Sequence, residues 1–323
     1  MRCLKAIAPT VVALGGLLLS AACAPVVPAT PRTSPQARPA GLVRPAAAPT
    51  QATPSAQSKA LGTYYARVQA DLLAQGLLRT DGGGPDTPYS SDDLLRNFEK
   101  IAFFDEYERG AGLRTSRGGP GRLRRWDRPV RFSVEFGASV PEAQRTSDRA
   151  EVQTYAARLA RVTGHPISVS PDNANFFVLI MGEDDRAAAM PRVRQIVPNI
   201  NPASLSILED IPRSIHCLVI AFSGSDNDHI YRKAIALVRA EHPDLLRKSC
   251  LHEELAQGLG LANDSPQARP SIFNDDDEFA LLTTHDEMLL KMLYDPRVSA
   301  GMSPDEARPI LRQIASDLIS GPS

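Results

Sequence analysis

The sequence predicts an α+β fold with a twisted mixed sheet, and three observations support this prediction. Residues 129–136 alternate between apolar and polar side chains, which is the pattern of a half-buried strand. Residues 176–181 and 215–222 are continuous apolar runs, which suit strands that are buried on both faces. Longer segments with helical spacing surround these strands without strict alternation, so the α+β class is favoured over a regular α/β repeat.

Two helices are expected before the first strand, at 61–78 and 91–107. The second begins in a cluster of Ser and Asp residues that suits an N-cap. Its apolar residues recur at helical spacing, namely Leu94, Leu95, Phe98, Ile101 and Ala102. Three glycines and a proline at 82–85 are expected to break the chain between the two helices.

The middle of the chain is expected to form strands joined by a long helix. Val130, Phe132 and Val134 share one face of the first strand. A helix over 141–162 follows, because Tyr155 and Leu159 belong to an apolar stripe with a spacing of three to four residues. The strands at 176–181 and 215–222 come after it.

The C-terminal part is expected to contain one more strand and three helices. Residues 233–240 favour a strand that pairs with the preceding one through a turn at 224–229, with a helix as the alternative. Helices are expected at 243–260, 284–294 and 304–319. The last of them opens with the capping-box residues Ser303 and Glu306.

Residues 1–22 have the composition of an export signal. Arg2 and Lys5 precede an apolar run over 6–19, and small residues follow up to Cys23. The apolar run is too short to span a bilayer. We therefore predict that the chain is exported and that residues 1–22 are removed as a signal peptide.

The end of this segment, residues 19–23, resembles a bacterial lipobox. The resemblance implies cleavage before Cys23 and acylation of its thiol, which would attach the protein to a lipid bilayer. Ala24 in the next position implies the outer membrane, with the protein facing the periplasm. The alternative is ordinary signal cleavage, which would leave a soluble periplasmic or secreted protein.

Residues 23–58 are rich in proline, alanine, serine and threonine, and they contain no acidic or aromatic residue. Such a segment cannot bury enough apolar surface to fold. We therefore predict a disordered tether that leads to a single globular domain at 59–323. N-terminal helices are expected within 59–110 of this domain and its core within 129–295.

The charge balance gives little attraction for polyanions. Lys and Arg number 36 and Asp and Glu number 37, so the net charge is −1. This balance provides no electrostatic drive toward nucleic acid. We expect the partners to be the lipid bilayer, through acylated Cys23, and an envelope peptide or protein.

Two of the four cysteines are available to the folded domain. Cys3 leaves with the signal peptide and Cys23 would carry the lipid, so Cys217 and Cys250 remain. In an oxidising compartment two such cysteines favour a disulfide. Two buried free thiols are the alternative.

The most informative stretch is 251–264. Positions four apart share a helix face, so Glu253 and Gln257 point the same way and Glu254 lies beside them. Gly260 can end this helix by taking a positive φ. Two polar residues, Asn263 and Asp264, follow on the chain that turns back.

This stretch resembles the H-E-x-x-H-x-x-G-x-x-H pattern of the metzincin peptidases. The resemblance places Glu253, Gln257 and Asn263 at the metal-ligand positions, Glu254 at the general base and Gly260 at the turning glycine. A frame that starts at His252 instead would put alanine at both remaining ligand positions, Ala256 and Ala262.

The ligand positions argue against zinc. Zinc is bound by His, Cys and carboxylates, whereas Gln257 and Asn263 are neutral amides. Oxygen atoms of Glu253 and Asp264 would better suit a harder divalent cation such as calcium. A cofactor is therefore not identified by the sequence.

These replacements favour a binding or scaffolding module, in which the former peptidase cleft holds a peptide and Glu254 has no chemical task. The alternative is a metal-dependent hydrolase or peptidase, in which Glu253 and Asp264 hold a metal and Glu254 acts as general base on its water. A third interpretation is an amphipathic helix whose polar face, including Gln257, lies in water without any site.

The metzincin resemblance extends over 129–295. Metzincins follow the zinc helix with a methionine-bearing turn and a helix that often ends in Leu-Tyr. Here Leu293 and Tyr294 end the helix at 284–294, but no methionine lies between residues 265 and 282. The resemblance implies a zincin-type domain with the helix at 243–260 along a cleft below the sheet.

The chain is also similar over most of its length to an uncharacterised family of bacterial lipoproteins, known only by a domain-of-unknown-function label. The residues that carry this similarity run from Phe98 through the 250–264 stretch to Arg297. This resemblance implies a location in the cell envelope and no mechanism.

Two charged segments are expected to be surface loops. The acidic run at 274–278 lacks the spacing and glycine of an EF-hand loop, so a solvated loop is favoured over a calcium site. The arginine-rich stretch at 109–131 is expected to be a flexible surface loop, with contact to phosphate groups of envelope lipid as the alternative.

Overall fold

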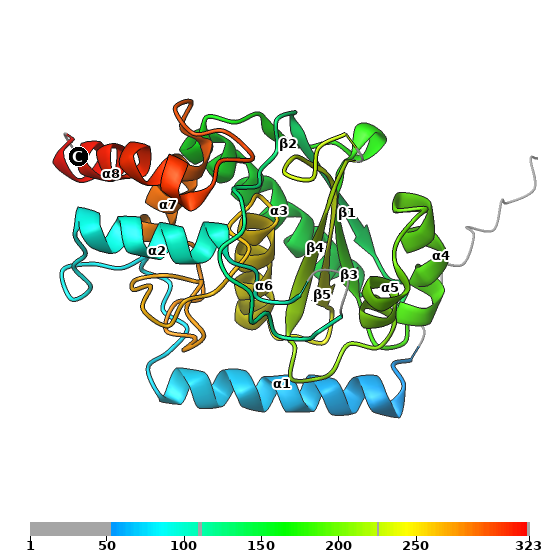
Figure 1. The fold of residues 1–323 in the computed structure, drawn as a ribbon. Helices are drawn as coiled ribbons and strands as arrows, with labels where there is room; N and C mark the ends of the chain where they lie inside the picture. Colours follow the sequence, from blue (N-terminus) through cyan, green and yellow to red (C-terminus); the bar gives the residue numbers. More distant parts are fainter. Residues whose placement is uncertain (1–52, 109–111, 225, 322–323) are drawn as a thin grey trace, which may run out of the picture. The chain divides into compact units, whose positions relative to one another are not determined.

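The computed structural model describes residues 53–108, 112–224 and 226–321 (Figure 1). The predicted signal peptide, Cys23 and the tether up to residue 52 lie outside these residues. The described residues belong to one structural unit, Thr50–Ser323.

The centre of this unit is a five-stranded mixed sheet with the order β2-β1-β3-β5-β4. Its strands are β1 (Val130–Phe136), β2 (Ile167–Val169), β3 (Phe176–Met181), β4 (Cys217–Ser223) and β5 (Tyr231–Arg239). Strands β2, β1, β3 and β5 run parallel, and β4 pairs with β5 antiparallel at the edge. The α+β class and the mixed sheet are confirmed, and 233–240 is a strand rather than a helix.

Helices pack on both faces of the sheet. The α-helices are α1 (Ala56–Ala74), α2 (Ser91–Phe103), α3 (Glu142–Thr163), α4 (Arg186–Ile196), α5 (Pro202–Glu209), α6 (Asp244–Gln257), α7 (Thr284–Tyr294) and α8 (Pro304–Ser320). Helices α4 and α5 lie on one side of the sheet, and α3 and α6 lie on the other (Figure 1).

Strand β3 is apolar along its whole length because both of its faces are buried. Phe176, Val178 and Ile180 point into the core that β3 shares with α2, α3, α6, α7 and α8. Phe177 and Leu179 point into a second core under α4 and α5. Since both faces of the strand are covered, no position of it can be polar without a buried partner.

Four elements were not predicted: α4, α5, β2 and the 3₁₀ helix η1 (Pro171–Asn173). Helix α4 contains Pro191, and a proline inside a helical pattern ordinarily indicates a break. Helix α5 is only eight residues long, although Asn201 caps it and Pro202 opens it in the expected way. Strand β2 has three residues, which is too short to show a period.

The first helix begins earlier than predicted, inside the range assigned to the tether. The Ser55 side chain accepts a hydrogen bond from the Ser58 backbone N–H and caps α1. The Ser58 hydroxyl donates to Glu241 at 2.8 Å, which holds the start of α1 against the chain that follows β5. The predicted end at residue 78 was also too late, because α1 ends at Ala74.

None of the helices in the described residues is both long and apolar enough to span a bilayer.

Candidate functional site

Helix α6 carries the predicted motif and has two different faces. Leu251 and Leu255 are fully buried in the main core and fix the orientation of the helix. Glu253, Glu254 and Gln257 lie on the face toward β4, where they line a cleft of about 440 Å³. The interpretation of α6 as a helix with its polar face in open water is therefore wrong.

The antiparallel edge strand forms another wall of this cleft, because most residues from 214 to 223 line it. In the sheet of the described chain, β4 pairs only with β5, and no strand pairs with its other edge. Further walls come from the segment after α2 and from the loop before α7, through residues such as Tyr107 and Phe279.

The cleft is strongly acidic. Its lining includes Asp105, Glu106, Glu108, Glu253, Glu254, Asp264, Asp275 and Asp277. The lining residues described by the structure include one arginine, Arg124, which forms an ion pair with Asp105. The remaining carboxyl groups are left close together without a matching number of cations.

Glu254 is the most buried of these acids. Its residue exposure is 3%, and its Oε2 atom has no hydrogen-bond partner. Burial raises the pKa of Glu254 well above its usual range, and the nearby Glu106 and Asp264 raise it further. A buried carboxyl group without a donor is costly, so this position is stabilised by any cation that enters the cleft.

Glu253 and Asp264 share this environment. Burial raises the pKa of Glu253 well above its usual range, and Asp264 and Glu254 add repulsion. Burial is also the main reason why the pKa of Asp264 rises to about 7, ahead of Glu106 and Asp275. The Gln257 amide donates to Asp264 at 3.1 Å, which partly opposes this rise.

The Asn263 side chain points away from the cleft and toward the end of α2. Its side-chain amide donates to the Lys100 carbonyl at 3.1 Å and to the Asp264 carbonyl at 2.8 Å. It is 8% exposed and is not among the residues that line the cleft. Of the predicted ligand positions, the structure therefore brings Glu253, Gln257 and Asp264 together with Glu254, while Asn263 joins the turn to α2.

Gly260 has the positive φ that the sequence predicted, at 132°. The helix itself ends earlier, at Gln257. A Cβ atom at Gly260 would lie 2.4 Å from the Arg124 carbonyl oxygen, so the chain can pass Arg124 closely only with glycine here. This close turn brings Asp264 back toward α6.

His252 has a structural role away from the cleft. Its Nδ1 accepts from the Leu282 backbone N–H at 3.1 Å, so its Nε2 carries the proton and donates to Glu151 at 3.2 Å. The ring stacks on Tyr155. Burial lowers the pKa of His252, which keeps the ring neutral. The frame that used His252 as a metal ligand finds no support in this geometry.

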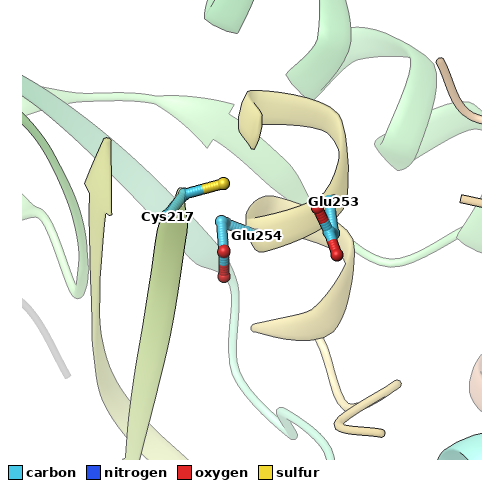
Figure 2. A group of neighbouring side chains, drawn as sticks. All are labelled: Cys217, Glu253 and Glu254. Carbon is cyan, nitrogen blue, oxygen red and sulfur yellow. The ribbon is translucent and has the colours of Figure 1, made fainter. Parts of the chain in front are cut away.

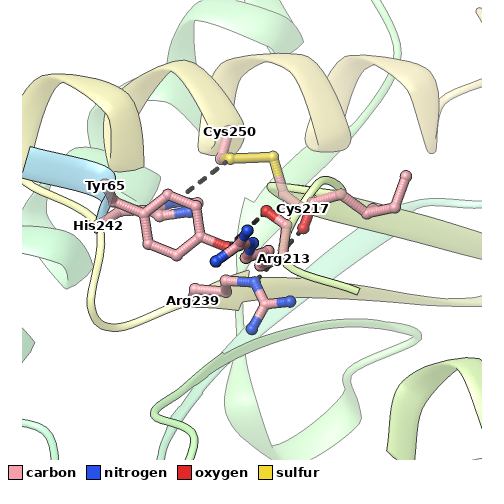
Figure 3. Close-up of a disulfide and its surroundings, with 7 residues drawn as sticks. Tyr65, Arg213, Cys217, Arg239, His242 and Cys250 are labelled. Atoms are coloured by element: carbon pink, nitrogen blue, oxygen red, sulfur yellow. Dashed lines mark hydrogen bonds between the residues drawn. A yellow bond between two sulfur atoms is a disulfide. The ribbon is translucent and has the colours of Figure 1, made fainter. Parts of the chain in front are cut away.

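The predicted disulfide between Cys217 and Cys250 is confirmed, with the two Cα atoms 5.8 Å apart. It joins the edge strand β4 to helix α6 beside the cleft (Figure 3). Around it lie the rings of Tyr65 and His242, and the His242 Nδ1 atom is 3.7 Å from the Cys250 sulfur.

Among the described His, Cys, Asp and Glu residues, Cys217, Glu253 and Glu254 form a group in which each residue offers a ligand atom. These atoms lie within 4.8 Å of one another. Figure 2 shows Glu254 on α6 beside the strand that carries Cys217. The Cys217 sulfur is bonded to Cys250, so in this form the group offers two carboxylates and no thiolate.

Several cleft residues were not predicted as site residues. Glu106 and Asp277 lie far from α6 in the sequence, and burial raises the pKa of both. The run at 274–278 was expected to be a solvated loop, but Asn274, Asp275 and Asp277 line the cleft. The low count of basic residues around that run was the signal that could have indicated a shared acidic site.

The arginine-rich stretch is also not a simple flexible loop. Arg124 is 4% exposed and pairs with Asp105. Arg125 donates to the carbonyl oxygens of Leu293 and Val298, at 2.5 and 2.6 Å. Arg124 thus holds the chain to the segment after α2 and Arg125 holds it to the C-terminal part, so neither guanidinium group is free for phosphate.

Comparison with known proteins adds a family and no activity. No curated protein and no solved structure matches the chain. One family model matches residues 91–313, a range that begins with α2, includes the whole sheet and the motif on α6, and ends within α8. The chain therefore belongs to the family described as protein of unknown function (DUF2927).

Proposed function

We propose that this chain is an envelope lipoprotein whose metzincin-like domain binds an extended, positively charged peptide segment in the acidic cleft. The observation that carries the proposal is the position of β4, an edge strand with one unpaired side that forms a wall of this cleft. Extended peptides bind such edges by adding a strand, with side-chain pockets that supply specificity.

The motif region supports the metzincin-like part of the proposal. Helix α6 presents Glu253, Glu254 and Gln257 to the cleft, and the chain turns back at Gly260. The helix that follows ends at Tyr294, whose hydroxyl donates to the Leu259 carbonyl at 3.0 Å. These contacts support a metzincin-like scaffold around ligand positions that carry no histidine.

The charge of the cleft supports a cationic ligand. Six of its eight acidic side chains remain after Asp105 pairs with Arg124 and Glu108 pairs with Arg114. Their mutual repulsion is relieved when a lysine or arginine side chain enters, and the same charges repel an acidic peptide. Charge should thus select the ligand, while the backbone of β4 should hold it.

A fluorescence-anisotropy titration tests this function with two labelled peptides, one rich in lysine and valine and one in which glutamate replaces lysine. The lysine peptide is expected to bind and the glutamate peptide is not. Glu253→Gln should weaken binding by about tenfold, because it removes a carboxyl group that is ionised when a cationic side chain lies beside it. Asp71→Asn, on the exposed side of α1, removes a charge without touching the cleft and should change nothing.

Equal binding of both peptides, or no binding of either, would contradict the proposal. Competition by high salt gives a further check, because attraction between exposed charges is screened at high ionic strength. Binding that survives high salt and ignores Glu253→Gln would indicate an apolar ligand instead.

A metal-dependent hydrolase is the second candidate, and one observation favours it. The unpaired Oε2 of Glu254 is the kind of atom that a cation or a metal-bound water would satisfy. We prefer binding because Gln257 and Asn263 are amides and Asn263 does not line the cleft. Stoichiometric divalent metal in protein purified without chelator, with hydrolysis that is lost in Glu254→Gln, would establish the hydrolase.

The proposed anchor rests on Cys23, which lies outside the described residues. Cys23→Ala should release the protein from membranes into the soluble fraction, because the acyl chains would have no attachment site. Fractionation after a high-salt wash measures this. A variant that still sediments with the membranes would show that another feature holds the protein there.

A further inference from the structure

The group formed by Cys217, Glu253 and Glu254 has a property that the peptide-binding proposal does not use. One ligand atom of each residue lies within 4.8 Å of the other two. The sulfur belongs to the disulfide with Cys250, so its ability to bind a metal depends on its oxidation state. Reduction or oxidation of these two cysteines therefore changes which ligand atoms the cleft offers to a metal ion.

We propose that reduction of the Cys217–Cys250 disulfide creates a binding site for a thiophilic divalent metal ion such as zinc, held by the Cys217 sulfur and the carboxylates of Glu253 and Glu254. Cysteine sulfur and carboxylate oxygen are both established zinc ligands in proteins. A fourth position would be open to water. This donor set differs from the positions that the metzincin motif assigns, because it uses β4 and omits Gln257 and Asn263.

The chemical step balances with a dithiol as reductant. The dithiol supplies two electrons and two protons, the sulfur–sulfur bond of the protein breaks, and the dithiol closes to its own disulfide. Cys217 and Cys250 each become thiols. When the metal binds, the Cys217 thiol releases its proton to solvent and the resulting thiolate becomes a ligand.

The geometry allows the three donors to close on an ion. Tetrahedral zinc with bond lengths of about 2.0–2.3 Å places its donors about 3.4 Å apart, so each donor must move by roughly an ångström. Neither carboxyl group is held by a hydrogen bond or an ion pair in the described chain, and Oε2 of Glu254 is buried without a partner. Cys217 is only partly buried and lines the cleft.

Charge favours the metal more strongly in the reduced form. The oxidised cleft offers two carboxylates at this point, whereas the reduced one adds a thiolate and gives the ion three charged ligands. Cys250 is 2% exposed and lies beside His242 on the far side of the bond, so it stays out of the cleft (Figure 3). Cys217 is thus the cysteine whose sulfur lies within 4.8 Å of a carboxylate oxygen of both Glu253 and Glu254.

Cadmium titration of Cys250→Ser tests the site, since this variant frees the Cys217 thiol without any reductant. One cadmium ion per chain is expected, with the ultraviolet charge-transfer band of a cadmium–thiolate bond. Oxidised wild type and the double variant Cys217→Ser/Cys250→Ser should show no band. Glu254→Gln in the Cys250→Ser background should weaken binding by at least about tenfold, and Asp71→Asn in that background should not.

Wild type reduced with a phosphine, which contributes no thiolate band, provides the second measurement if Cys250→Ser does not fold. Circular dichroism before and after reduction shows whether the domain is intact. A folded, reduced protein without the band would overturn the proposal. So would a band whose affinity is unchanged by Glu254→Gln, because the thiol would then bind cadmium without the carboxylates.

Discussion

Replacing Asp148 with alanine is expected to lower the free energy of unfolding by about 3–5 kcal/mol, the usual cost of removing one partner from a buried ion pair. Asp148 lies on α3 and is 3% exposed. Its two carboxylate oxygens accept from Nε of Arg247 on α6, at 2.8 and 2.9 Å. The substitution would leave the Arg247 guanidinium buried without its main counter-charge.

The environment of this pair explains why the effect should be large. Burial raises the pKa of Asp148, and Arg247 opposes that rise. Arg247 also donates to the His242 carbonyl at 2.5 Å, so it ties α3, the end of β5 and α6 together. Loss of Asp148 therefore weakens the support of the helix that carries Glu253 and Glu254.

Urea denaturation of wild type and Asp148→Ala measures the effect. Asp244→Ala is the matched control, because Asp244 also pairs with Arg247 but its side chain is 91% exposed. This control should cost less than about 1 kcal/mol, as exposed ion pairs usually do. Equal losses in the two variants would show that burial does not decide the contribution of the pair.

The double variant Cys217→Ser/Cys250→Ser is expected to lose about 3–4 kcal/mol. The cysteines are separated by 33 residues, and a loop of this length corresponds to about 3.8 kcal/mol in the chain-entropy model. In the folded state the bond connects β4 to α6, so its loss should also loosen the two walls of the cleft. Binding of the lysine peptide should weaken together with stability.

Thermal and urea unfolding of oxidised wild type, reduced wild type and the double variant measure this loss. Reduced wild type should resemble the double variant, and reductant should have no effect on the double variant. Hydrogen exchange should become faster in β4 and the first half of α6. A loss below about 1 kcal/mol would mean that packing alone holds the strand to the helix.

The family match places this fold and cleft within a group of proteins whose activity is not established. The matched residues include every strand and both sides of the disulfide. The acidic cleft and the bond between β4 and α6 thus lie within the matched region, whereas Tyr65 of α1, which packs against His242 beside this bond, lies outside it.

Much of the fold could be predicted because the apolar pattern and capping residues of a segment match the burial of that segment in the folded structure. The period of two at 129–136 and the apolar run at 176–181 predicted β1 and β3, since a strand displays its burial pattern directly in its sequence. Capping residues predicted the start of α2 and α8. Helix α4 was missed because a proline inside a segment, here Pro191, locally disfavours a helix. The helix is stabilised by burial against the second face of the sheet, which the local sequence does not show.

The sequence by itself determined the class of fold and the face of α6 that carries Glu253, Glu254 and Gln257, and it favoured a Cys217–Cys250 disulfide over two free thiols. Each of these depends on spacing along one segment or on the number of available cysteines. The tertiary structure decided that Glu106 and Asp277 join these acids and that Asn263 turns away to Lys100. Charge repulsion and burial act through space, so a shared acidic cleft exists only once segments distant in the sequence have packed together.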